Sequence, residues 1–120
     1  MEDYRDLVVW QKSMELVKIV YALSKQLPKE ETFALSNQLR RAVISIPSNI
    51  AEGYGRNSTQ DYLRFLNIAR GSKNEVETQL QICLLLEYMN QDEIAPGLAL
   101  CKEVSKMLNA LIHSISYKQE

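Results

Sequence analysis

The chain has 120 residues, of which 46% are hydrophobic and 24% are charged, a composition typical of one soluble globular domain, here residues 1–120. With 14 basic and 15 acidic side chains the net charge is −1, so no overall field favours nucleic acid or a membrane surface. The single histidine, His113, excludes a histidine-based metal site or a Ser-His-Asp triad within one chain.

Compartment is indicated by the termini, the apolar runs and the cysteines. The opening MEDYRD is acidic and polar, which is wrong for a secretory signal, and no apolar run approaches the roughly 20 residues of a membrane-spanning helix. Cys83 and Cys101 fall within apolar helical stripes and are predicted to be reduced core thiols. We therefore expect a cytoplasmic protein without a membrane partner.

The first predicted helix covers residues 6–26 and carries two apolar stripes. One follows the 3–4 spacing of a helix face and comprises Leu7, Trp10, Met14, Val17 and Tyr21. The other lies beside it and comprises Val9, Leu16, Val20, Leu23 and Leu27. Both together are wider than one bundle core needs, so a second subunit is expected to cover one stripe, at Trp10 or its neighbours.

The second predicted helix covers residues 31–54. Its buried stripe comprises Leu35, Leu39, Ala42 or Val43, Ile46 and Ile50. Pro47 interrupts this pattern without changing its phase, which predicts a helix kinked at Pro47 rather than a loop over residues 44–49. Gly53 and Gly55 are expected to supply left-handed conformations at the C-terminal cap.

The third helix is predicted to start after Ser58, which forms a capping box with Asp61, and to continue towards Met89. Its apolar stripe comprises Tyr62, Phe65, Ala69, Ser72, Val76, Leu80 and Cys83. Asn90 is expected to take a left-handed cap, and the fourth helix to begin near Asp92. The heptad stripe of that helix comprises Ile94, Leu98, Cys101, Ser105, Leu108, Ile112 and Ile115.

No strand alternation interrupts these helices, and short connections make successive helices antiparallel. The predicted fold is therefore all-α, an up-down-up-down antiparallel four-helix bundle with its second helix kinked at Pro47.

Basic residues gather in the middle of the chain. Residues 36–73 hold six cations against Glu52 and Asp61, and these candidates for contact with a partner or with phosphate are Arg40, Arg41, Arg56, Arg64, Arg70 and Lys73. Candidates for polar contacts between helices or subunits are Ser45, Asn49, Glu52, Ser72 and Glu75. Salt bridges within the assembly are the simpler interpretation of these charges; a phosphate-binding rim is the alternative.

Two of these polar groups lead to specific expectations. Arg41 and Glu52 share a helix face but lie about 16 Å apart, so each needs a partner on another helix or subunit. The Ser72 hydroxyl is expected to bond a carbonyl one turn back.

Catalysis is not predicted. Ser45, Ser48 and Ser72 have no neighbouring base, and Glu52 with Glu75 lacks the Glu-x-x-His pattern of a di-metal bundle. No glycine-rich loop precedes a helix to hold phosphate. We expect no enzymatic activity and no cofactor.

Three stretches resemble one family: LVVWQKSMELV (7–17), LSNQLRRAVISIPSNIAEGYGR (35–56) and DYLRFLNIARGSKNEVETQL (61–80). They are similar to the 23S rRNA intervening-sequence proteins, bacterial four-helix bundles, and the resemblance extends over nearly the whole chain. The specific elements are QLRRA at 38–42, SNIAEG at 48–53, and Ala69 with Gly71, Ser72 and Glu75.

The resemblance implies a ring, typically of five subunits, without established enzymatic activity. Accessory proteins of diversity-generating retroelements look like relatives, and those basic pentamers contact a reverse transcriptase and nucleic acid. We therefore expect a homo-oligomeric accessory protein or scaffold, with RNA, single-stranded DNA or a nucleic-acid-processing protein as possible partner classes. The alternative is a protein-interaction module without nucleic-acid contact.

Overall fold

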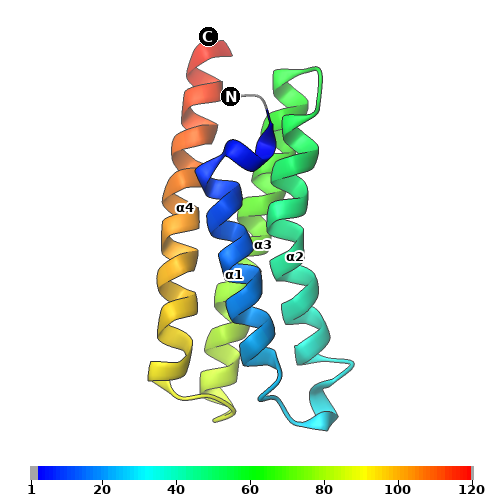
Figure 1. Ribbon diagram of the computed structural model, residues 1–120, viewed down its shortest axis with the longest axis vertical. Coiled ribbons are helices and arrows are strands. Elements are labelled where there is room, and N and C mark those ends of the chain that lie inside the picture. The colour runs from blue at the N-terminus through cyan, green and yellow to red at the C-terminus, as the bar shows by residue number, and fades with distance from the viewer. Residues whose placement is uncertain (1–2, 120) are drawn as a thin grey trace.

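Four long helices dominate residues 3–119, which the computed structural model describes; Met1, Glu2 and Glu120 of the predicted domain lie outside the described residues. The helices are α1 (Val8–Ser24), α2 (Leu35–Tyr54), α3 (Thr59–Leu85) and α4 (Gln91–Gln119). Two short 3₁₀ helices, η1 (Tyr4–Asp6) and η2 (Lys29–Glu31), precede α1 and α2. Figure 1 shows successive helices running in opposite directions, which confirms the predicted all-α bundle.

Each helix packs against two others: α1 and α3 both contact α2 and α4. The bundle measures 47 × 24 × 22 Å. Its axis is filled by fully buried aliphatic side chains from all four helices, the largest being Leu16, Leu39, Ile46, Ile50, Leu66, Leu80, Ile94 and Leu108. Burial of these side chains is the main favourable contribution to folding.

Helix α2 continues through Pro47 as predicted, and residues 44–49 are helical rather than a loop. Pro47 is buried in the core with Ile46 and Ile50, so its ring adds apolar burial although it cannot donate an amide hydrogen bond within the helix. The helix starts at Leu35 rather than at residue 31, because Glu31 belongs to η2. The bend at Pro47 stays a prediction.

The glycine cap predicted for α2 is wrong. No glycine among the described residues has a positive φ, and Gly55 has φ −82° and ψ −1°. Gly53 serves close packing instead, since a Cβ there would lie 2.8 Å from Phe65 Cβ and 3.3 Å from the Tyr62 carbonyl oxygen. A small residue is therefore needed where α2 meets α3.

The predicted start of α3 is confirmed, whereas its predicted end is wrong. Ser58 Oγ accepts the Asp61 amide at 3.1 Å, as predicted. At the other end α3 stops at Leu85 instead of continuing towards Met89, because Glu87 takes the left-handed conformation (φ 63°) expected of Asn90. The Tyr88 and Met89 amides then bond the Cys83 carbonyl, closing the helix end.

Candidate interaction surface

A small polar network joins α2 to α3. Ser72 Oγ and Ser45 Oγ lie 2.8 Å apart, and Asn49 Nδ2 donates to the Ser45 hydroxyl (2.9 Å) and carbonyl (2.7 Å). The prediction that Ser72 bonds a carbonyl of its own helix is wrong, since the facing hydroxyl of Ser45 lies within reach. Three predicted polar residues are thus brought together, and they connect helices within one subunit.

This network borders a polar surface depression that we call the α2/α3 groove. Its lining comprises Asn37, Gln38, Arg41, Ala42, Ser45, Ser72 and Glu75. Further along the same two helices it continues past Gln38 and Glu75 to Asn74, Thr78, Gln79 and Ile82. The groove therefore collects four of the predicted site residues: Arg41, Ser45, Ser72 and Glu75.

Two opposite charges in the groove have no partner among the side chains that the structure describes. Arg41 and Glu75 are both exposed, and neither side chain forms an ion pair or hydrogen bond among residues 3–119. Glu52, by contrast, pairs with Arg56 one turn along α2. The expectation that Arg41 needs a partner outside its own helix therefore stays open, whereas Glu52 finds one inside it.

Gln79 was missed by the sequence reasoning. It is buried, and its Oε1 accepts no hydrogen bond among the described residues. An unsatisfied buried carbonyl oxygen costs about 1–3 kcal/mol. The signal was its spacing, because Gln79 lies three residues after Val76 and four before Cys83, on the buried face of α3.

The six predicted cations are scattered, and five have partners. Arg56 and Arg64 lie over the Phe65 ring, 4.8 and 4.5 Å from its centroid, and pair with Glu52 and Asp61. Arg70 donates to Asn67 and Asn109. Arg40 donates to Ser24 Oγ at 3.0 Å and stacks 5.4 Å from the Tyr21 centroid.

Lys73 lies differently from the other five, because it is buried. Only 7% of its side chain is exposed, and its ammonium pairs with Glu77 on the same helix. It is therefore turned into the bundle, near Cys101 of α4, rather than presented to a partner.

Helix α1 buries one of its two apolar stripes and leaves the other half-exposed. Val9, Leu16, Val20 and Leu23 of one stripe are buried. In the other stripe Leu7 is also buried, whereas Met14 is 43% exposed and Trp10, Val17 and Tyr21 are half-buried. The half-exposed stripe faces a depression that we call the α1/α2 groove, lined by Val17, Lys18, Tyr21, Ala22, Lys25 and Ile44. Ile44 of α2 is also 43% exposed.

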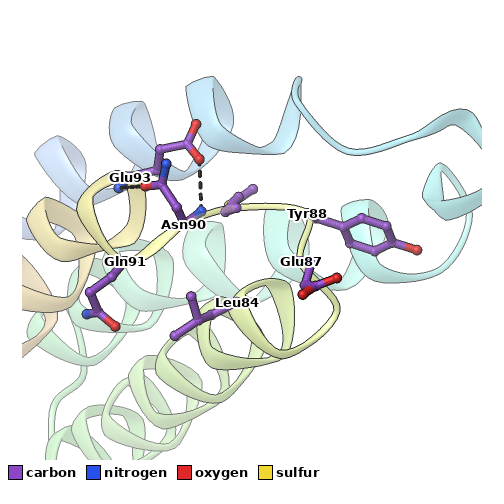
Figure 2. A pocket seen from close by; sticks show the side chains of 7 residues that line it. Leu84, Glu87, Tyr88, Asn90, Gln91 and Glu93 are labelled. Atoms are coloured by element: carbon purple, nitrogen blue, oxygen red, sulfur yellow. Dashed lines mark hydrogen bonds between the residues drawn. The ribbon is translucent and has the colours of Figure 1, made fainter.

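Another pocket lies at the turn from α3 to α4, lined by Leu84, Glu87, Tyr88, Met89, Asn90, Gln91 and Glu93. In Figure 2 two dashed lines join Asn90 and Glu93, a reciprocal capping box that starts α4. The Tyr88 ring points away from these residues, and its hydroxyl donates to Glu31 Oε2 at 2.9 Å. That hydrogen bond raises the pKa of Tyr88. These contacts tie two connections together at one end of the bundle.

The thiols are held in an unreactive state. Burial raises the pKa of Cys83 to about 11 and that of Cys101 to about 12, so both are protonated near neutral pH. Within residues 3–119 no three His, Cys, Asp or Glu side chains gather as a metal site. No helix in the described part of the chain is long and apolar enough to cross a membrane.

Comparisons with known proteins agree with this geometry. No curated protein matches the chain significantly. A crystal structure of a protein of unknown function from the S23 ribosomal protein family of Bacteroides thetaiotaomicron is similar, with 31% identity and a TM-score of 0.80 over 87% of this chain and 97% of that one. The family model described as 23S rRNA-intervening sequence protein matches residues 5–110. The chain therefore belongs to the 23S rRNA-intervening sequence protein family.

Proposed function

We propose that this protein is a non-enzymatic, homo-oligomeric scaffold, expected to contain five subunits, that binds a protein partner through the α2/α3 groove. The observation that carries the assembly is the half-exposed apolar stripe of α1, which continues onto Ile44 of α2. Apolar surface of this kind is removed from water when subunits meet. The protonated thiols and the mutually bonded Ser45 and Ser72 hydroxyls support a role without nucleophilic catalysis.

Light scattering of the purified protein at micromolar concentration tests the assembly. Wild type is expected to give a multiple of the 13.8 kDa chain mass. The double variant Met14→Glu/Ile44→Glu should dissociate, because it places charges on the apolar stripe. Ile68→Glu is the matched control, since Ile68 is 41% exposed but lies on α3. A monomeric wild type would refute the assembly.

Partner binding is assigned to the α2/α3 groove because its polar groups are unsatisfied. A partner that supplies an acid to Arg41 and a donor to Glu75 would satisfy both exposed charges. Arg41→Glu should abolish capture of the partner from native cells with or without nuclease, whereas Lys102→Glu on α4 should not. Capture unchanged by Arg41→Glu contradicts this site.

Nucleic-acid binding is a second candidate, supported by one observation. Arg56 and Arg64 both stay exposed, and their guanidinium groups lie 4.8 and 4.5 Å from the centroid of the same Phe65 ring, so each subunit carries two cations at one place. A ring would multiply this charge by avidity. Two results together would support this candidate. Wild type should bind RNA or single-stranded DNA with little sequence preference and with an affinity that falls steeply as salt rises. The double variant Arg56→Glu/Arg64→Glu should lose this binding while its oligomer stays intact. No binding at low salt removes it.

A further inference from the structure

Phe33 is an aromatic side chain standing in solvent. It is 93% exposed, the largest exposed fraction among the large hydrophobic residues described. It lies between η2 and α2, in the connection that Figure 1 shows projecting at the end of the bundle where α3 turns into α4. Full burial of such a ring contributes about 1.5–3 kcal/mol of favourable free energy, so binding that covers Phe33 would gain stability that the single subunit lacks.

The segment that carries Phe33 is held by hydrogen bonds before and after that residue. Glu31 accepts hydrogen bonds from the Tyr88 hydroxyl at 2.9 Å and from the Leu35 amide at 3.4 Å. The Ala34 amide bonds the Glu31 carbonyl, and the Thr32 amide bonds that of Lys29. A projecting side chain on a preorganised segment loses little conformational entropy when it binds.

The α1/α2 groove offers matching chemistry. Its floor is apolar, from Val17, Tyr21, Ala22 and Ile44, and its rim carries Lys18 and Lys25. Both lysines are exposed, and neither forms an ion pair among the described residues. Arg40, stacked on Tyr21, adds a third positive charge beside this floor.

Two of the three charges in the η2 helix that precedes Phe33 are of the opposite sign, since Glu30 and Glu31 are acidic and Lys29 is basic. Glu30 and Glu31 precede it, and Glu30 is exposed without an ion pair in the described part of the chain. An aromatic group beside acids therefore fits an apolar groove with a basic rim. Each copy of the chain carries both halves of this pair.

We infer that Phe33 of one copy inserts into the α1/α2 groove of a neighbouring copy, with Glu30 facing Lys18 and Lys25. This inference rests on the proposed self-assembly and names the contact that produces it. The occupant of the groove is a second copy, because the same sequence supplies the aromatic group, the acids and the hydrogen-bonded support.

Light scattering over a dilution series of the full chain tests this contact. Phe33→Ser should raise the dissociation constant of the assembly about tenfold or more. Far-UV circular dichroism should stay unchanged, because the side chain touches little of its own bundle. Tyr117→Ser is the matched control, an aromatic residue 71% exposed on α4, and should leave the dissociation constant unchanged.

Exchanging the charges of Glu30 and Lys25 tests the same contact between copies without changing Phe33. Glu30→Lys and Lys25→Glu should each weaken assembly, and the two together should restore most of it. As a test of placement, a copy with Phe33→Cys mixed with a copy with Ala22→Cys should form a disulfide between chains when a mild oxidant such as oxidised glutathione accepts the two electrons. Tyr117→Cys in place of Phe33→Cys should not, and the protonated Cys83 and Cys101 should remain inert.

The outcomes separate this inference from the proposed function. An oligomeric wild type whose dissociation constant is unchanged by Phe33→Ser overturns the Phe33 contact and leaves the scaffold proposal standing. A wild type that is monomeric at every concentration overturns both.

Discussion

Gly53 and Gly71 are two helical glycines in opposite surroundings. A Cβ on Gly53 would lie 2.8 Å from Phe65 Cβ, an atom next to the backbone of α3, whereas a Cβ on Gly71 would meet nothing within 4 Å. Gly53 therefore allows α2 and α3 to approach closely. Gly71 makes no such contact, and its only effect is to lower the helix propensity of α3.

Gly53→Ala should destabilise the protein by about 1–2 kcal/mol, because helix α3 must shift to admit the methyl group. Gly71→Ala should stabilise it by about 0.5–1 kcal/mol, since alanine favours the helix without a steric cost. Urea unfolding of both variants checks this pair. Equal effects on the free energy of unfolding would contradict the close packing at Gly53.

The two buried thiols should make the free energy of unfolding depend on pH. Their folded pKa values, about 11 for Cys83 and about 12 for Cys101, lie above the ordinary 9.0. The protonated thiols therefore contribute stability that is fully present below pH 9 and is lost as pH rises through the folded values. The stability advantage of wild type over Cys83→Ala/Cys101→Ala should shrink over that interval in urea unfolding. A constant difference would show that the thiols are not shielded.

At the scale of elements, Lys73 and Glu77 lie where α3 faces α4. The lysine side chain is buried and that of Glu77 is 38% exposed, so the carboxylate compensates a charge that water reaches poorly. A buried cation that loses its partner is destabilising. An apolar side chain of similar length in place of Lys73 removes the buried charge, and the Glu77 carboxylate that remains is 38% exposed and can stay hydrated.

Glu77→Ala should therefore destabilise the fold by about 1–3 kcal/mol, while Lys73→Met should be nearly neutral or stabilising. Thermal unfolding measures both. Lys12 and Glu15, 3.8 Å apart on α1, form the exposed control pair, and Glu15→Ala there should change stability by less than about 1 kcal/mol. A Lys73→Met variant as unstable as Glu77→Ala would mean that Lys73 itself is required.

At the scale of the whole molecule, assembly should make thermal stability depend on concentration. Subunits that associate when folded stabilise the folded state by mass action. The unfolding temperature of wild type should therefore rise with protein concentration, and that of Met14→Glu/Ile44→Glu should not. Differential scanning calorimetry over a dilution series measures this. A flat wild-type response indicates a monomer.

What the sequence determined by itself was local. Periodic apolar spacing identified four helices, the capping box placed the start of α3 at Ser58, and an unbroken phase carried α2 through Pro47. These features depend on residues within one or two turns of each other. The reduced buried cysteines followed from the same spacing.

What only the tertiary structure decided were the contacts between elements. Spacing shows that two stripes exist on α1, but the packing of α2 and α4 decides which one is buried. Lys73 and Gln79 sit on the buried face of α3 and were recognisable by their spacing from Val76, yet their burial depends on the helices that cover them. Phe33 stands in solvent two residues after Glu31, which is anchored to Tyr88, 57 residues away along the chain. Contacts between residues so far apart cannot be predicted from apolar spacing, because either partner can change without altering the helical pattern around it.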